Sequence, residues 1–304
     1  MKKEAFDPGL TTQFSGDLRR TINADGSFNV KRSGTNWRDT NPYLTLVGTT
    51  WPRFLLAFAV AFLIINMIFA GVYLAVGIDN LKGLESGMSA YSNAFFFSVH
   101  TLTTVGYGNI YPQGPVANSI SAFEAATGLM VFAVATGLLF ARFSRPTARI
   151  LYSTNAIIAP YQDGTSLQFR VTNARSNTLM NLEAKVLLMT VEQADGIPKR
   201  SFIDLPLERT RIYFFALTWT VVHPIDEASP FFGKTAEDLK RLSAEVLILL
   251  QGFDDTFSQV VHSRYSYRHD EFIWGAKFIP SFKVDKKGAL VVELDRISEM
   301  KVLS

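Results

Sequence analysis

The chain has 304 residues, of which 48% are hydrophobic and 19% are charged, a balance too apolar for an ordinary soluble protein of this size. The formal net charge is only +3, which argues against wholesale nucleic-acid binding. No cysteine is present, so disulfides and thiolate metal sites are excluded. This length and composition indicate a membrane protein with a substantial soluble part, in about two domains.

The N-terminal part is polar, and residues 1–35 contain a cluster of turn-forming side chains, so we expect a flexible segment there. It has no apolar stretch followed by a cleavage site, which argues against a removed signal peptide. Residues 36–51 mix aromatic, charged and aliphatic side chains ahead of an apolar run. Within them, residues 41–50 are predicted to form a short amphipathic helix in the membrane interface, with Pro42 in its first turn. A polar linker is the alternative.

Residues 52–143 are predicted to form a membrane domain. Residues 54–78 carry no charged side chain and are long enough to cross a hydrocarbon core of about 30 Å. Residues 115–141 form the second predicted span, in which Glu124 is the only ionisable residue. Residues 91–103 between the spans are too short to cross, so we expect a re-entrant pore helix whose C-terminal end favours a cation in a central cavity.

The loop after this short helix has the sequence Thr103-Thr104-Val105-Gly106-Tyr107-Gly108. Loops of the TVGYG type are the established filters of potassium channels, so a known mechanism is applied here: backbone carbonyls replace the water shell of the ion. Glycine allows the dihedral angles that turn successive carbonyls inward. We predict K+ binding at Thr104, Val105, Gly106 and Tyr107, with Gly108 completing the filter. One chain supplies a quarter of each carbonyl ring, so the function requires four copies. A surface turn is the alternative, which the flanking spans disfavour.

Basic residues cluster on one side of the predicted membrane domain. They are Lys31, Arg32, Arg38 and Arg53 before the first span and Arg142, Arg145 and Arg149 after the second. Because positive charge is enriched on the cytoplasmic side of membranes, both termini are predicted to be cytoplasmic.

Residues 144–304 contain no further span, and short apolar or alternating runs recur there between turn signals. This spacing predicts an all-β sandwich. The predicted strands are residues 166–172, 183–192, 213–222, 245–250, 258–267, 272–278 and 290–294. Thr235, followed three residues later by Asp238, predicts an N-capped helix over residues 235–242.

These features resemble the inward-rectifier potassium channels, especially their bacterial branch. The resemblance rests on residues 95–99, 104–108, 140–146, 223–230 and 270–275. It implies a homotetramer in the bacterial inner membrane, whose pore domain has two transmembrane helices and a re-entrant pore helix. It also implies a cytoplasmic immunoglobulin-like β-sandwich that extends the pore, and a slide helix at residues 41–50.

The resemblance further assigns a gate and a lipid site. Phe140 occupies the family's gate position and Phe132 a second position that faces the cavity, where rings of phenylalanine block ions because a narrow apolar tube dewets. Packing against lipid or a helix is the alternative for both. The residues that correspond to a site for anionic phospholipids or phosphoinositides are Arg38, Arg142, Arg145 and Arg149. Charge that only sets the topology is the alternative.

The sequence departs from the family pattern behind the filter. His100 and Ile110 stand where many members pair glutamate with arginine, so that ion pair is absent. We expect His100 to be hydrogen-bonded behind the filter rather than to sense pH. Glu124 is expected to face the pore helix or the rear of the filter, because an ionisable side chain facing lipid is costly. Both residues are predicted to support the filter. Phe132 and Asn181 replace acidic positions of strong rectifiers, which argues against strong polyamine block.

An enzyme is not expected. The sequence has no dinucleotide-binding, P-loop or zinc-protease motif, and His223, His262 and His269 lie at unrelated spacings. No cofactor is expected apart from the permeant potassium ion. The alternative functions are a less selective pore-loop cation channel and a membrane-anchored ligand sensor. An appended nucleotide-binding domain is disfavoured, because strands and helices do not alternate after the spans.

Overall fold

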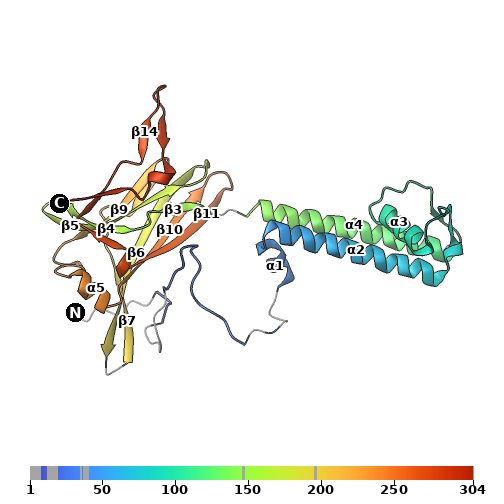
Figure 1. The fold of residues 1–304 in the computed structure, drawn as a ribbon, viewed down its shortest axis with the longest axis horizontal. Coiled ribbons are helices and arrows are strands. Elements are labelled where there is room, and N and C mark those ends of the chain that lie inside the picture. Colours follow the sequence, from blue (N-terminus) through green and yellow to red (C-terminus); the bar gives the residue numbers. More distant parts are fainter. Residues whose placement is uncertain are drawn as a thin grey trace. The chain divides into compact units, whose positions relative to one another are not determined.

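The computed structural model describes residues 8–11, 20–34, 36, 41–145, 148–194 and 197–303. It divides into two compact units, which are a helical unit of residues Gly34–Arg145 and a β-rich unit of Met1–Ser33 with Pro146–Ser304 (Figure 1). The division after Arg145 lies close to the predicted domain boundary at residue 144. The N-terminal residues, however, belong with the β-rich unit rather than forming a segment of their own.

The helical unit contains the predicted slide helix, both spans and the pore helix. Asn41 begins the slide helix, since its side chain accepts hydrogen bonds from the N–H groups of Tyr43 and Leu44. Among the described residues, α2 and α4 are long and apolar enough to cross a membrane, and little of either is buried within the chain. The helices are α1 (Pro42–Gly48), α2 (Trp51–Val76), α3 (Ala90–Leu102) and α4 (Pro115–Phe143).

The pore helix α3 packs against both spans at one end of this unit (Figure 1). Ser89 caps its N-terminus by accepting a hydrogen bond from the N–H of Ser92. Its apolar face joins Phe69 and Tyr73 of α2 in a small core to which Phe97 contributes from α3. The loops on either side of α3 are tied together by η2 (Ile78–Asn80) and the two short strands β1 (Leu81–Lys82) and β2 (Tyr111–Pro112).

The β-rich unit consists of two five-stranded sheets that enclose one hydrophobic core, which confirms the predicted all-β sandwich. In the first sheet the order is β11-β10-β6-β7, with β8 also paired to β6. In the second sheet the order is β12-β4-β5-β3, with β9 also paired to β5. The strands are β3 (Ile150–Tyr152), β4 (Ala156–Tyr161), β5 (Gly164–Asn173), β6 (Leu179–Ala194), β7 (Ile197–Asp204), β8 (Arg211–Phe214), β9 (Thr218–Ile225), β10 (Glu245–Asp254), β11 (Gln259–Arg268) and β12 (Phe272–Trp274).

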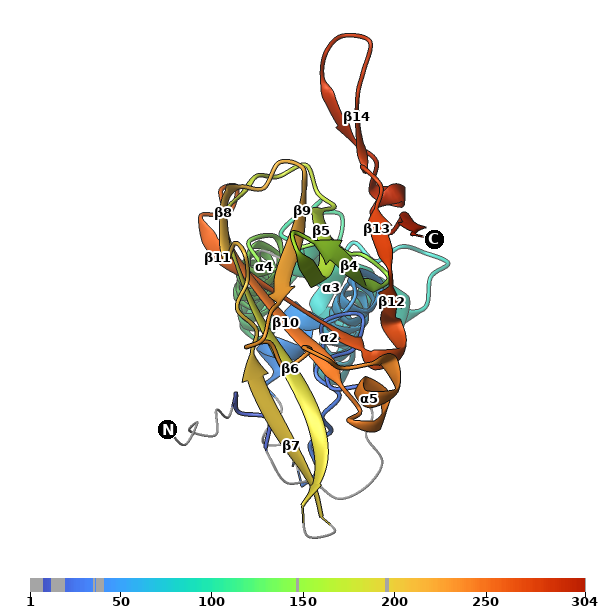
Figure 2. The same ribbon diagram turned by 90° about the vertical axis from the view of Figure 1, so that its left-hand side faces the viewer.

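Smaller elements complete this unit. The helix α5 (Ala236–Arg241) begins at Thr235, whose hydroxyl accepts from the N–H of Asp238 while the Asp238 carboxylate accepts from Thr235, so the predicted capping box is confirmed. The hairpin of β14 and β15 stands away from the two sheets (Figure 2). The remaining elements are β13 (Ala276–Phe278), β14 (Phe282–Val284), β15 (Leu290–Val292), β16 (Met300–Val302), η3 (His269–Glu271) and η4 (Leu294–Arg296).

Two of the predicted strands are wrong as single strands. Residues 213–222 divide at Phe215 into β8 and β9, which belong to different sheets. The pattern is continuous because the buried Phe215 lies where the chain crosses the shared core between the sheets. Residues 272–278 divide at Gly275, whose φ of +64° is a left-handed conformation that breaks the strand. The strand β4 was missed because its first four residues are all buried, so it shows no alternation.

Within the N-terminal segment, for which we expect flexibility, residues 20–30 dock on the first sheet. Ile22 is buried and forms an isolated β-bridge with Phe28. The carboxylate of the buried Glu245 accepts hydrogen bonds from the Thr21 N–H at 2.9 Å and the Thr21 hydroxyl at 2.8 Å. Arg20 pairs with Glu271 at 2.8 Å. A buried carboxylate is costly without hydrogen-bond donors. The segment supplies donors to Glu245, and the sheet in turn binds the segment.

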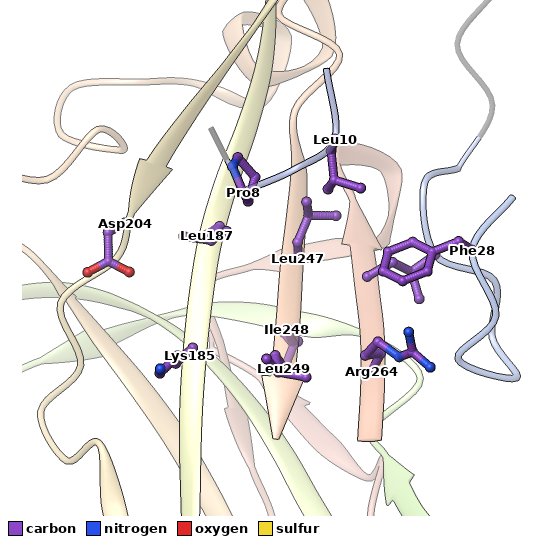
Figure 3. Close-up of a pocket in the computed structure, with 11 residues that line it drawn as sticks. Pro8, Leu10, Phe28, Lys185, Leu187, Asp204, Leu247, Ile248, Leu249 and Arg264 are labelled. Carbon is purple, nitrogen blue, oxygen red and sulfur yellow. The ribbon is translucent and has the colours of Figure 1, made fainter. Parts of the chain in front are cut away.

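Beside this segment the docked chain encloses a pocket of about 330 Å³ (Figure 3). Leu10 and Phe28 of the N-terminal part face Leu187 and Leu247 of the sheet across it. The apolar side chains that hold the segment on the sheet are thus dispersed among polar residues, which is why the composition suggested flexibility.

We predict that Thr21→Val lowers the stability of the β-rich unit by about 1–3 kcal/mol, because the buried carboxylate of Glu245 loses a hydroxyl donor. The thermal unfolding midpoint of the purified protein measures this change. Ser27→Ala is the matched control, since the Ser27 hydroxyl bonds only within its own exposed turn. Equal midpoints for the two variants would contradict the docking argument.

A second prediction concerns pH. His223 is buried, its Nδ1–H donates to the carbonyl of Pro206 at 2.6 Å, and its Nε2 lies 2.8 Å from the Ser229 hydroxyl. Burial lowers the pKa of His223, although Asp226 and Asp204 oppose this shift. The unfolded chain therefore binds the proton more readily than the folded chain, and stability falls as pH drops below the unfolded value of about 6.5.

We expect the thermal midpoint to decrease between about pH 7 and pH 5.5, and His223→Gln to reduce this slope. The glutamine keeps an amide donor for Pro206 but does not titrate. A slope that is the same in both proteins would show that other groups cause the pH dependence.

Candidate functional site

The predicted filter begins directly at the end of α3. The N–H groups of Val105 and Gly106 both donate to the carbonyl of His100, at 2.9 and 3.1 Å, and the N–H of Thr104 donates to the carbonyl of Thr101 at 3.0 Å. These bonds hold the amide side of the loop against the last turn of the pore helix. The carbonyl oxygens of the loop are then left for other partners.

The backbone of the loop alternates in handedness. Thr104, Gly106 and Gly108 have φ values of +59°, +51° and +80°, while Val105 and Tyr107 between them do not have positive φ. Glycine adopts such angles at little cost, whereas threonine in this region is strained by about 1–2 kcal/mol. Alternation of this kind turns successive peptide carbonyls toward the same side, which is the geometry that a filter of carbonyl rings requires.

The filter is open on one side of the single chain. Val105 and Tyr107 are 51% and 74% exposed, and apart from adjacent residues nothing in the described part of the chain lies within 4 Å of a Cβ placed on Gly106 or Gly108. A row of backbone dipoles along one open side can provide only part of the coordination of an ion. The arrangement therefore fits a site that several chains complete together.

The two residues predicted to support the filter both lie next to α3. The ring of His100 packs edge-on against the ring of Tyr107 with 4.9 Å between centroids, so its side-chain contact within the described chain is aromatic rather than the expected hydrogen bond. Glu124 is fully buried and accepts hydrogen bonds from the hydroxyl of Tyr73 at 2.6 Å and from the hydroxyl of Ser98. Glu124 thus faces the pore helix as expected, while its supporting role stays a prediction.

Sequence reasoning missed the partners of Glu124. Asn66 and Tyr73 are polar side chains seven residues apart in an otherwise apolar span, which puts them on one face of α2. Ser98 lies in the pore helix and bridges Glu124 to Asn66, 3.0 Å from the Asn66 Oδ1. The spacing of polar residues along α2 was the available signal.

The two predicted gate residues lie on α4 and are largely exposed, Phe132 by 73% and Phe140 by 72%. Phe132 lines a hollow of about 470 Å³ that Thr103 and Thr104 also border, so the structure brings it near the start of the predicted filter loop. Phe140 lies about two turns farther along α4. Large exposed aromatic side chains on an apolar helix require a covering surface, either lipid or another chain.

Of the four arginines of the predicted lipid site, Arg142 and Arg145 lie in the described part of the helical unit, and a site shared by all four stays a prediction. Arg38 lies outside the described residues, Arg145 ends the helical unit, and Arg149 belongs to the β-rich unit, where its carbonyl accepts from the Ala174 N–H. Nothing in the structure therefore shows that these arginines share one site.

Arg142 has a structural role that could not be predicted from the sequence. Its guanidinium donates to the carbonyls of Leu46 at 2.5 Å and Thr49 at 2.8 Å. It also lies 4.6 Å from the ring centroids of both Trp51 and Phe54. A cation at the C-terminus of a helix satisfies its free carbonyls, so Arg142 fastens α1 to α4.

Comparison with known proteins agrees with this architecture. The family model described as "Ion channel" matches residues 54–145, and the one described as "Inward rectifier potassium channel C-terminal domain" matches residues 150–303. The chain is 38% identical over 285 residues to the inward rectifier potassium channel Kirbac3.1 of Paramagnetospirillum magnetotacticum, which covers 92% of this chain and 95% of that protein.

Mammalian channels are more distant relatives. The ATP-sensitive inward rectifier potassium channel 12 of Bos taurus is 27% identical over 86% of this chain and 67% of its own length. The G protein-activated inward rectifier potassium channel 3 of Mus musculus is 29% identical over 90% of this chain and 76% of its own length. The chain is therefore a membrane protein that belongs to the inward rectifier potassium channel family and functions as a potassium channel.

Proposed function

We propose that four copies of this chain surround one axis, along which residues 104–108 of each chain form the potassium filter. The alternating handedness at Thr104, Gly106 and Gly108 carries this proposal. With four chains, the carbonyls of Thr104, Val105, Gly106 and Tyr107 form rings whose dipoles replace the hydration shell of K+. The hydroxyl of Thr104 adds oxygen ligands at the inner end. The permeant ion is the only ligand that this function requires, and no enzymatic step is involved.

The pore helix supports cation entry in the same assembly. The carbonyls in the last turn of α3 give its C-terminal end a partial negative charge, because the peptide dipoles of a helix add along its axis. Two of these carbonyls, those of Thr101 and His100, are bonded to the filter loop itself. The remaining field favours a cation in the cavity below the filter.

Gating is proposed at the rings formed by Phe132 and Phe140 of four α4 helices. Both side chains are largely exposed in the single chain, which leaves them available to line a shared axis. A narrow ring of phenylalanine expels water and thereby stops ions without filling the pore. The hollow between Phe132 and Thr104 supports a cavity on the inner side of the filter.

The proposed setting is a bacterial inner membrane with both termini in the cytoplasm. Supporting it, basic residues flank the two spans on the same side, as the positive-inside tendency requires. Arg38, Arg145 and Arg149 are proposed to contact anionic phospholipids or phosphoinositides, each contributing about 1 kcal/mol near an anionic leaflet. Arg142 would act indirectly, since its donors hold α1.

The filter prediction is tested by Gly108→Ala, measured as rubidium uptake into liposomes that contain the purified protein. A side chain at φ +80° strains the filter, so we expect uptake to fall at least about tenfold. Gly114→Ala is the matched control, because Gly114 has a φ of +82° and equally open surroundings but lies outside the filter. Similar uptake by the two variants, or equal uptake of sodium by the unaltered protein, would contradict the proposed filter.

The gate prediction is tested by Phe140→Asp, which places a charged side chain in the proposed apolar ring. Rubidium uptake should increase, because water and ions then occupy the constriction. Phe143→Asp is the control, since the ring of Phe143 packs against the ring of Trp51 with 5.1 Å between centroids. An increase of the same size in both variants would indicate general disruption of the helix end.

A further inference from the structure

A fully buried polar cluster lies behind the proposed filter. It joins three helices, and its members are Asn66 and Tyr73 of α2, Ser98 of α3 and Glu124 of α4, none of them more than 2% exposed. Polar side chains in a membrane domain are costly unless each finds a partner. Here both carboxyl oxygens of Glu124 accept a hydrogen bond. Oε2 accepts from the hydroxyl of Tyr73, and Oε1 accepts from the hydroxyl of Ser98.

The number of hydrogens in this cluster is informative. The hydroxyl of Ser98 has one hydrogen but lies against two acceptors, Glu124 Oε1 and Asn66 Oδ1. The Asn66 amide cannot relieve this, because its NH2 group faces away from Ser98 and donates to the carbonyl of Phe62 at 2.7 Å, which leaves Oδ1 facing Ser98. A hydrogen carried by the Glu124 carboxyl and shared with Ser98 would free the Ser98 hydrogen for Asn66. Every polar atom named here would then have a partner, and an amide at position 124 could do the same.

A second contact lies one turn along α4. A Cβ on Gly128 would lie 2.0 Å from the carbonyl oxygen of Leu102 and 2.9 Å from its carbonyl carbon, so only glycine fits there. Glu124 and Gly128 are four residues apart, and so are Ser98 and Leu102. Residues with this spacing lie on one helix face. The helix α4 therefore contacts α3 at two points one turn apart, Glu124 with Ser98 and Gly128 with Leu102.

The filter is attached between these two points. The carbonyl of His100, which accepts from Val105 and Gly106, and the carbonyl of Thr101, which accepts from Thr104, both lie between Ser98 and Leu102. A shift of this turn along the axis of α3 therefore moves the filter backbone with it. Positions of coordinating groups must hold within a fraction of an ångström for selective recognition.

We propose that Glu124 and Gly128 are positioning residues that together clamp the last turn of the pore helix and so set the spacing of the filter carbonyls. This proposal rests on the proposed function, because it requires that residues 104–108 coordinate the ion. Glu124 acts in it through hydrogen bonds rather than through charge. Gly128 acts through close backbone contact rather than as a flexible point in α4.

The decisive comparison is Gly128→Ala against Gly137→Ala, two helical glycines of α4 of which only the first meets an obstacle. The ratio of rubidium to sodium uptake into liposomes is measured for protein that elutes as the same oligomer as the unaltered channel. Gly128→Ala should lower the ratio at least about tenfold, and Gly137→Ala should leave it within about twofold. An unchanged ratio in Gly128→Ala, or an equal loss in both, overturns the clamp.

The carboxyl contact is tested with milder changes, which also serve if Gly128→Ala does not assemble. Glu124→Gln should keep the ratio within about twofold of the unaltered channel, while Ser98→Ala and Glu124→Ala should lower it. If Glu124→Gln loses as much selectivity as Glu124→Ala, the charge is required. That result would overturn the claim that Glu124 acts through hydrogen bonds. An unaltered channel without rubidium preference would instead refute the proposed function itself.

Discussion

The structure of the pore depends on two hydrogen bonds that share one acceptor, from the N–H groups of Val105 and Gly106 to the carbonyl of His100. They fix the amide side of the filter loop to the pore helix. The alternating φ values turn the carbonyls away from that helix. The amide donors are therefore bonded within the protein, while the carbonyl acceptors stay available for the proposed ion site. If these amide N–H groups were not bonded to the pore helix, they would be exposed together with the carbonyls, and the loop would not present carbonyl oxygens alone.

This constraint explains the construction of the helical unit around α3. The pore helix has 13 residues, too few to span a membrane, so its position must come from neighbouring helices. Apolar packing by Phe97 does not define a position along the helix axis as sharply as hydrogen bonds do. The buried cluster of Glu124, Ser98 and Tyr73 provides such bonds.

The membrane half was largely predictable from sequence, because lipid imposes strict rules on length and charge. The first span was expected at residues 54–78 and is a helix at Trp51–Val76, and the pore helix differs by one residue at each end. The filter at residues 104–108 stays a prediction from a short motif, and the alternating φ values of this loop are the geometry that the prediction requires. The partners of Glu124 were predictable only in part, since the spacing of Asn66 and Tyr73 marks one face of α2 but the helix that meets this face is defined only when three helices pack.

The β-rich half was less predictable, and two of the errors there share a cause. Alternation of apolar and polar side chains identifies a strand with one buried face, but β4 is buried on both faces. Residues 213–222 contribute first to one sheet and then to the other. The docked N-terminal segment was missed for a related reason. Its contact with Glu245 joins residues more than two hundred positions apart, and no local sequence pattern predicts such a pairing.

The central claim is that backbone carbonyls of residues 104–107 from four chains bind the ion directly. Anomalous scattering from rubidium in crystals of the full-length protein tests it most directly. We expect rubidium peaks in a row on a fourfold axis at the level of Thr104 to Tyr107, within contact distance of their carbonyl oxygens. Assembly without fourfold symmetry, or ions held only by side chains away from this loop, would contradict it.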